Sequence, residues 1–179
     1  MQALELVAPL TPLVVAPLGF LGGGGRRISL PMVFACALPA AGSFALDYGT
    51  LAMLLTLPWL VFTAVEAWNL RGLWWRDPAM AGSRLYLFAG SVMLSLSRVG
   101  FGAERVGMSD DRLLLASIHC WYAGFAAACF ARLTRRAAGR DSVLHRVSLT
   151  GILCGAALLV MGTFGSPVME HMGGGVLIL

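Results

Sequence analysis

Long apolar runs separated by short polar segments extend over most of the chain. About 20 consecutive apolar residues are needed for a helix to cross the hydrocarbon core of a bilayer. Runs near this length predict six membrane-spanning helices, at 4–21, 30–46, 49–69, 85–102, 113–131 and 147–168. We therefore predict an all-α fold, a polytopic transmembrane helical bundle built as a single integral membrane domain over residues 1–179.

Both ends of the chain depart from a regular spanning helix. The first run contains Pro9, Pro12 and Pro17, which predict a bent helix because proline removes a backbone donor. The C-terminal stretch MGGGVLIL begins another apolar run and stops after four apolar residues. Four residues cannot span a bilayer, so we expect an incomplete segment, as in a fragment or a short product.

Composition supports the membrane class. Hydrophobic residues make up 58% of the chain and charged residues only 12%, whereas a soluble domain carries roughly 25% charged residues. All 13 basic residues are arginine, which favours a bacterial origin with a GC-rich genome. These arginines lie between the apolar runs, a pattern typical of membrane topology, so we expect a lipid bilayer and no nucleic acid as partner.

The distribution of arginine predicts the orientation. The segments after the first, third and fifth predicted helices hold ten arginines, and the segments on the other side hold two, Arg105 and Arg112. Cytoplasmic loops carry the excess of basic residues. We therefore expect the bacterial cytoplasmic membrane, with the N-terminus outside and the Arg-rich loops in the cytoplasm.

Ionisable side chains inside the apolar runs are the candidate functional groups. The stretch SIHCWYAGF places His119 and Tyr122 in the fifth predicted helix. At 1.5 Å per residue, His119 lies about 10 Å below the outer surface and Arg98 about 6 Å below it. Glu5 and Asp47 lie near the same surface, so these five side chains are expected to share the outer half of the bundle.

Each candidate also has a purely structural interpretation. Arg98 would extend its guanidinium to the headgroups, His119 would hold a neutral imidazole bonded to a neighbour, and Tyr122 would pack. Glu5 would lie at the interface, where it could pair with Arg98. Motifs of hydrolases, metalloproteases and nucleotide-binding proteins do not occur. We expect no cofactor, and no metal site, because His119 has no histidine or cysteine ligand at a suitable spacing.

The stretch LLLASIHCWYAGFAAA resembles the signature helix of the YndJ-like family of bacterial membrane proteins, which carries a His-x-His-Tyr-Ala-Gly-Phe motif. The segments ALPAAGSF, LLTLPWLVFTAVEA and SRVGFGAERVGMSDD are similar to the family's other segments, in the same order. The resemblance marks Arg98, His119, and the Tyr-Ala-Gly-Phe positions 122–125. Trp121 replaces the family's second histidine, which argues against a two-histidine metal site.

Three functions are consistent with these residues. The first is an intramembrane acid/base enzyme, a cyclase, isomerase or hydrolase acting on a lipophilic small molecule, with catalytic His119, Arg98, Tyr122 and Glu5. The second is a membrane transporter or carrier, although no inverted repeat is apparent. The third is a structural or accessory membrane protein in which these side chains fix helix packing.

Overall fold

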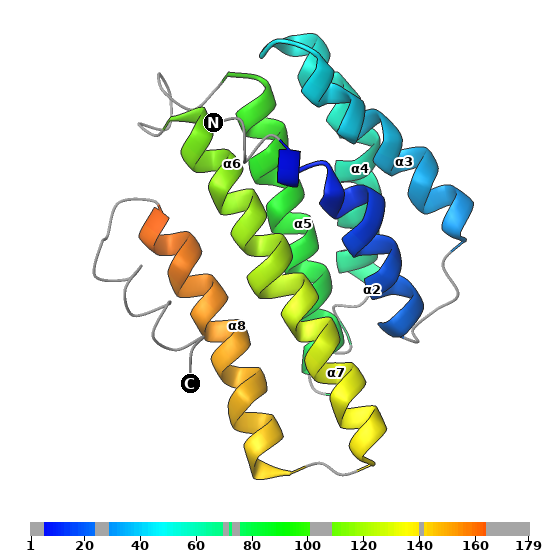
Figure 1. Cartoon of the computed structure of the whole chain (residues 1–179), viewed down its shortest axis with the longest axis vertical. Coiled ribbons are helices and arrows are strands. Elements are labelled where there is room, and N and C mark those ends of the chain that lie inside the picture. Colours follow the sequence, from blue (N-terminus) through cyan, green and yellow to red (C-terminus); the bar gives the residue numbers. More distant parts are fainter. Residues whose placement is uncertain are drawn as a thin grey trace.

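The computed structural model describes residues 6–23, 29–69, 72, 76–100, 109–139 and 142–163, and these form a bundle of antiparallel helices (Figure 1). The bundle is all-α, as predicted. In chain order the helical segments are the π-helix η1 (Thr11–Val15), α2 (Ala16–Gly23), α3 (Leu30–Gly42), the 3₁₀ turn η2 (Ser43–Ala45), α4 (Thr50–Asn69), α5 (Pro78–Arg98), α6 (Asp110–His119), the π-helix η5 (Cys120–Ala126), α7 (Ala127–Ala138) and α8 (Val143–Thr163).

Helices lie at all six of the predicted positions, but their lengths differ. Four stretches of the described chain are long and apolar enough to cross a membrane, at Thr50–Asn69, Pro78–Arg98, Asp110–Ala138 and His145–Gly162. The first two predicted segments contain shorter apolar helices, Thr11–Leu21 and Leu30–Ala45. Prolines fall in both: Pro12 lies within η1, and Pro39 lies inside α3.

Helix α5 begins seven residues earlier than the sequence pattern predicts. Asp77 is its N-cap, and its carboxylate accepts a hydrogen bond of 3.1 Å from the backbone N–H of Met80. Pro78 follows at the first helical position, where its missing N–H costs nothing. The Asp-Pro pair is therefore the start signal, and it places Arg84 inside the helix rather than in a loop.

The predicted fifth helix is one continuous stretch, α6–η5–α7, from Asp110 to Ala138. Its middle turns, Cys120–Ala126, are π-helical. Gly139 ends it with a positive φ of 63°, the left-handed conformation that glycine adopts without strain. π-Turns are rare and recur at functional sites, and this one contains the Tyr-Ala-Gly-Phe sequence.

Helix α5 is the central element of the bundle. It packs against α4, α6, η5 and α7, and its buried face is rich in glycine, alanine and serine. Small residues of this kind let helix backbones approach closely in membranes. Thr56 of α4 and Ser95 of α5 add a hydrogen bond of 2.8 Å between their hydroxyl groups.

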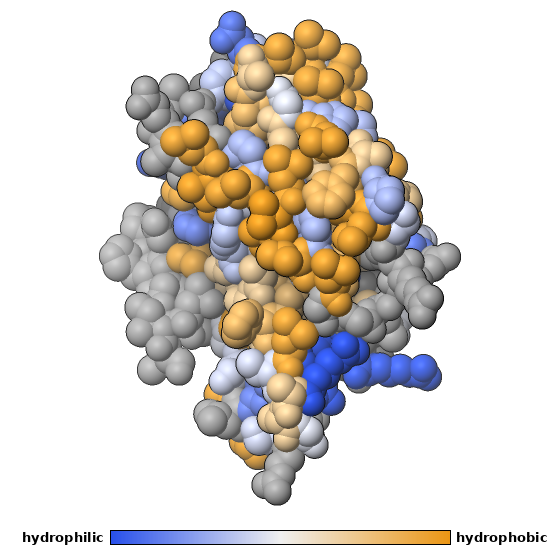
Figure 2. Space-filling model, turned by 45° about the vertical axis from the view of Figure 1, so that its right-hand side comes forward, coloured by the Kyte–Doolittle hydropathy of each residue, from blue (hydrophilic) through white to orange (hydrophobic). Residues whose placement is uncertain are grey.

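Large apolar side chains lie both inside and outside the bundle. Trp59, Trp121 and Phe125 are fully buried. Others face outward, for example Leu18, Val61 and Phe130. Figure 2 shows a broad apolar surface between strongly hydrophilic residues at the top and a larger group of them below it. An apolar exterior around a packed core is the arrangement expected of a protein whose solvent is lipid.

Candidate functional site

The π-helical turn η5 is a contact surface for three other helices. The Trp121 ring lies against Gly90 of α5, so closely that a β-carbon there would overlap the indole. Gly124 in turn accommodates the ring of Tyr86, whose hydroxyl donates to the backbone carbonyl of Leu153 in α8. The glycine of the Tyr-Ala-Gly-Phe sequence is therefore explained by close packing.

Phe125 extends this contact surface to α2. Its ring fills the space beside Gly19, where a β-carbon would clash with it, and its centroid lies 6.2 Å from that of Phe20. Phe125 is fully buried. The motif thus holds α2, α5 and α8 against one turn of helix, a role that sequence reasoning about acid/base groups did not predict.

Arg98 caps the corner between α3 and α4. It is 2% exposed, and its Nη2 donates to the carbonyl oxygens of Ser43, at 2.7 Å, and of Leu46. The guanidinium also lies over the rings of Phe44, at 5.0 Å, and Tyr48, at 4.6 Å. A cation beside the last carbonyls of a helix is favoured by the helix dipole. Arg98 therefore satisfies a helix terminus and does not extend to the bundle surface.

Cross-helix contacts fix the level of His119 relative to Arg98. Ser97 donates to the carbonyl of Asp110 at 3.1 Å, so the end of α5 is level with the start of α6. Deeper in the bundle, Ser117 donates to the carbonyl of Gly90 at 2.8 Å. Nine residues separate Asp110 from His119, so the histidine backbone lies about 13 Å from the Arg98 level along the helix pair.

The remaining predicted residues do not complete one cluster. Glu5 lies outside the described residues. Asp47 is exposed in the turn after η2, and Tyr122 is partly buried on η5. Of the predicted set, His119 and Tyr122 are the two that are close along the chain, three residues apart. The turn that joins them is π-helical, so the three-residue spacing does not bring them onto one side as it would in an α-helix, and Tyr122 is the one that borders a groove.

Tyr122 borders a groove between η5–α7 and α8. The groove has a volume of about 660 Å³, within the range of small-molecule sites. On one wall, Tyr122, Ala126, Phe130, Thr134 and Ala138 recur every four residues, which brings them onto one helix face.

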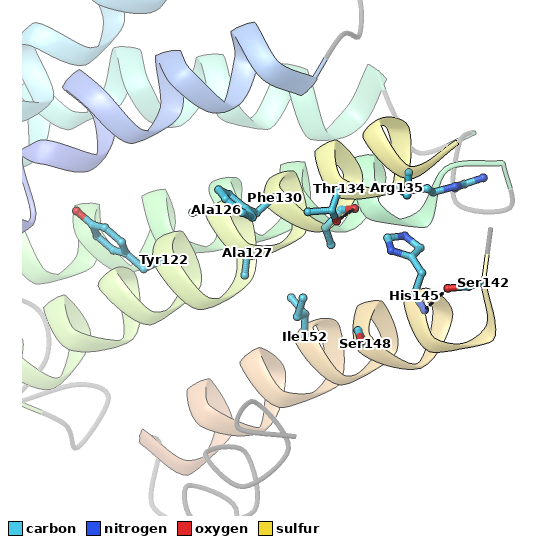
Figure 3. A pocket seen from close by; sticks show the side chains of 12 residues that line it. Tyr122, Ala126, Ala127, Phe130, Thr134, Arg135, Ser142, His145, Ser148 and Ile152 are labelled. Carbon is cyan, nitrogen blue, oxygen red and sulfur yellow. Dashed lines mark hydrogen bonds between the residues drawn. The ribbon is translucent and has the colours of Figure 1, made fainter. Parts of the chain in front are cut away.

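The two ends of the groove differ in chemistry. Figure 3 shows Tyr122 at one end and Arg135, Ser142 and His145 at the other, with the imidazole of His145 projecting from α8 toward α7. The Nε2 atom of His145 is buried and has no hydrogen-bond partner among the described residues. The groove is therefore apolar along its length and polar and basic where α7 ends and α8 begins.

A second cavity, of about 500 Å³, lies between α3 and α4. Its lining is apolar, with Leu54, Pro58 and Phe62 among its residues. The thiol of Cys36 is the one polar group among the residues that line it. The described part of the chain also contains no group of three or more His, Cys, Asp or Glu residues placed to hold a metal ion.

Two buried arginines were not among the predicted site residues. Arg84 of α5 is 2% exposed and Arg132 of α7 is 9% exposed. Arg132 forms an ion pair of 2.7 Å with Asp77, the N-cap of α5. Both were assigned by sequence to a loop or its edge. Recognising Asp77-Pro78 as a helix start would have placed Arg84 within the bundle.

The fold and its apolar exterior define a helical integral membrane protein. A family model described as YndJ-like protein matches residues 6–179, so the chain belongs to the YndJ-like family, as its motif helix indicated. Comparisons with curated proteins and with solved structures gave no significant match.

Proposed function

We propose that this YndJ-like protein binds a lipophilic small molecule in the groove between α7 and α8. The observation that carries the proposal is the groove itself, about 660 Å³ with an apolar length and a basic end at His145 and Arg135. Such a site suits a molecule with a hydrocarbon body and a polar or anionic head. The apolar walls would cover the body, and the imidazole and guanidinium would bind the head.

The membrane setting supports this class of ligand. Exposed apolar side chains surround the bundle, and Phe130, which borders the groove, is 71% exposed. A molecule dissolved in the bilayer could therefore enter sideways without crossing water. The basic end lies at the Arg-rich end of the bundle, which we propose faces the cytoplasm.

Filling the groove is the direct test of ligand binding. Ala127→Phe would occupy the space between α7 and α8, while Leu54→Phe changes the separate α3–α4 cavity. Native mass spectrometry of the protein released from membranes should detect a bound molecule on wild type and Leu54→Phe, and lose it on Ala127→Phe. Equal retention of ligand by all three proteins would rule out this site.

An intramembrane acid/base enzyme is the second candidate. It is favoured by Tyr122, a proton donor or acceptor that lines the groove, and by His119, three residues before it in the same continuous helix. The position of Arg98 supports a structural role for it in either function. Lipid extracts of cells expressing wild type or His119→Gln should then differ in one substrate–product pair. Identical extracts would favour binding alone.

A further inference from the structure

Arg84 is a buried cation, and no described residue accepts a hydrogen bond from it. Its guanidinium carbon lies 3.8 Å from the ring centroid of Phe20 and 5.7 Å from that of Phe125. Among the described residues, no acceptor lies within hydrogen-bonding distance of Nε or Nη1, and both atoms are buried. Contact with aromatic faces stabilises the charge in part, but it leaves these N–H groups unsatisfied.

Arg132 is a second buried arginine in this region whose N–H donors are not all hydrogen-bonded. Its ion pair with Asp77 holds it against the start of α5, seven residues before Arg84. Its Nε is paired with Asp77, while its buried Nη1 has no partner in the described chain. Asp77 also caps α5 through the N–H of Met80, so a single carboxylate serves both the helix terminus and Arg132. The Glu66 carboxylate also acts on the charge of Arg84.

Two like charges with unused donors are costly inside a bundle unless an anion joins them. Buried polar groups in proteins are almost always hydrogen-bonded, and buried charges are almost always paired. Guanidinium groups match phosphate and carboxylate oxygens through planar, paired N–H donors. The missing chemistry at this position is therefore that of a small oxyanion.

The arginine pair is separate from the α7–α8 groove. Phe125, Cys129 and Arg132 follow one another at helical spacing on the face of η5–α7 that meets α2 and α5, whereas Ala126, Phe130 and Thr134 face α8. Arg84 lies six residues from the start of α5 and Arg132 six from the end of α7. Both are thus about 9 Å inside the Arg-rich end of the bundle.

We infer that Arg84 and Arg132 form a binding site for a small oxyanion, a phosphate or carboxylate group, inside the Arg-rich end of the bundle. The Nε and Nη1 donors of Arg84 and the Nη1 donor of Arg132 bind its oxygens. Phe20 of α2 covers the Arg84 guanidinium and shields the site from the membrane. The anion is either a free ion that enters from the aqueous end or the headgroup of an acidic lipid.

Thermal unfolding in nanodiscs tests the site, with tryptophan fluorescence as the readout. In discs of zwitterionic lipid, inorganic phosphate or acetate should raise the Tm of wild type saturably, relative to chloride at equal ionic strength. Arg84→Gln and Arg132→Gln should weaken the apparent affinity at least about tenfold. Arg136→Gln, an equal charge change at an exposed position of α7, should bind as wild type does. Discs that contain phosphatidylglycerol, with no phosphate added, test whether the anion is a lipid headgroup. If it is, these discs should raise the Tm of wild type but not that of Arg84→Gln.

Two results would overturn the inference. One is a Tm that responds to phosphate, acetate and acidic lipid no more than to chloride. The other is an anion response that Arg84→Gln and Arg132→Gln leave intact. If Arg84→Gln does not fold, Arg84→Lys and Arg132→Lys replace it in the test. These variants keep the positive charge but lose the planar guanidinium with its paired N–H donors, so they should bind phosphate more weakly than wild type. Wild-type affinity in both lysine variants would count against the site.

Discussion

At the scale of single residues, charged groups in the apolar runs divide into those that complete backbone hydrogen bonding and those that do not. Arg98 belongs to the first kind, because its donors are directed at the carbonyls that end α3 and η2. Arg84 belongs to the second kind, because its contacts are aromatic rings. The sequence shows both simply as arginines near the ends of one apolar run, so it cannot separate these roles.

Replacing Arg98 tests its structural role. Arg98→Gln should lower the free energy of unfolding by about 1.5–3 kcal/mol, because it removes charge-assisted hydrogen bonds from two buried carbonyls. Arg112→Gln, at an exposed position in the first turn of α6, should change it by less than about 0.5 kcal/mol. Reversible denaturant unfolding measures both. Equal stability of the two variants would mean that Arg98 is retained for chemistry rather than for capping.

The histidine of SIHCWYAGF could be located by sequence only as far as its helix and approximate depth. Its level relative to Arg98 depends on where α5 ends and α6 begins. Two hydrogen bonds between these helices, from Ser97 to Asp110 and from Ser117 to Gly90, define that level. An error of four residues in the end of α5 changes the inferred level by about 6 Å. This is why His119 and Arg98 were expected at a similar level and the structure separates them.

At the scale of elements, η5 shows how one turn of helix can hold three neighbours. Gly90 and Gly124 lie on opposite sides of the α5–η5 contact, each against the aromatic ring of the other helix. Glycines are expected at such close helix contacts in membranes. The sequence could not indicate which ring meets which glycine, because that depends on the rotation of the π-helical turn.

Gly124 offers a sharp test of this packing. Gly124→Ala should destabilise the protein by about 1–3 kcal/mol, because the new β-carbon would overlap the ring of Tyr86. Gly42→Ala is the matched control, since nothing lies within 4 Å of a β-carbon there and its φ is −62°. It should be neutral or slightly stabilising. The same unfolding measurement compares them, and a tolerated alanine at position 124 would refute the close contact.

At the scale of the whole molecule, the helix directions bring the ends of α4 and α7 and the starts of α5 and α8 to one end of the bundle (Figure 1). The distribution of arginine predicts that this end is cytoplasmic. A cysteine introduced at Ser142 should therefore resist a membrane-impermeant maleimide in intact cells, while one at Ser109 should react. Both serines are exposed next to a helix start. Labelling of position 142 and protection of position 109 would show that the orientation is opposite to the predicted one.

The class of protein and the six helix positions could be predicted from the lengths of the apolar runs. The groove could not, because it depends on the separation of α7 and α8. One wall of the groove does correspond to a sequence pattern, the four-residue spacing of Tyr122, Ala126 and Phe130. That spacing is also typical of ordinary packing, so only the position of α8 distinguishes a cavity from a contact.

Photocrosslinking from inside the groove tests the central claim most directly. Benzoylphenylalanine at Ser148, which lines the groove, is compared with the same residue at the neighbouring position 147, where Val147 is exposed and lies outside the groove. In native membranes, position 148 should yield one dominant adduct that Ala127→Phe removes, and position 147 should yield adducts that follow bulk lipid composition. The same mixture of adducts from both positions, unaffected by Ala127→Phe, would contradict a specific ligand in the α7–α8 groove.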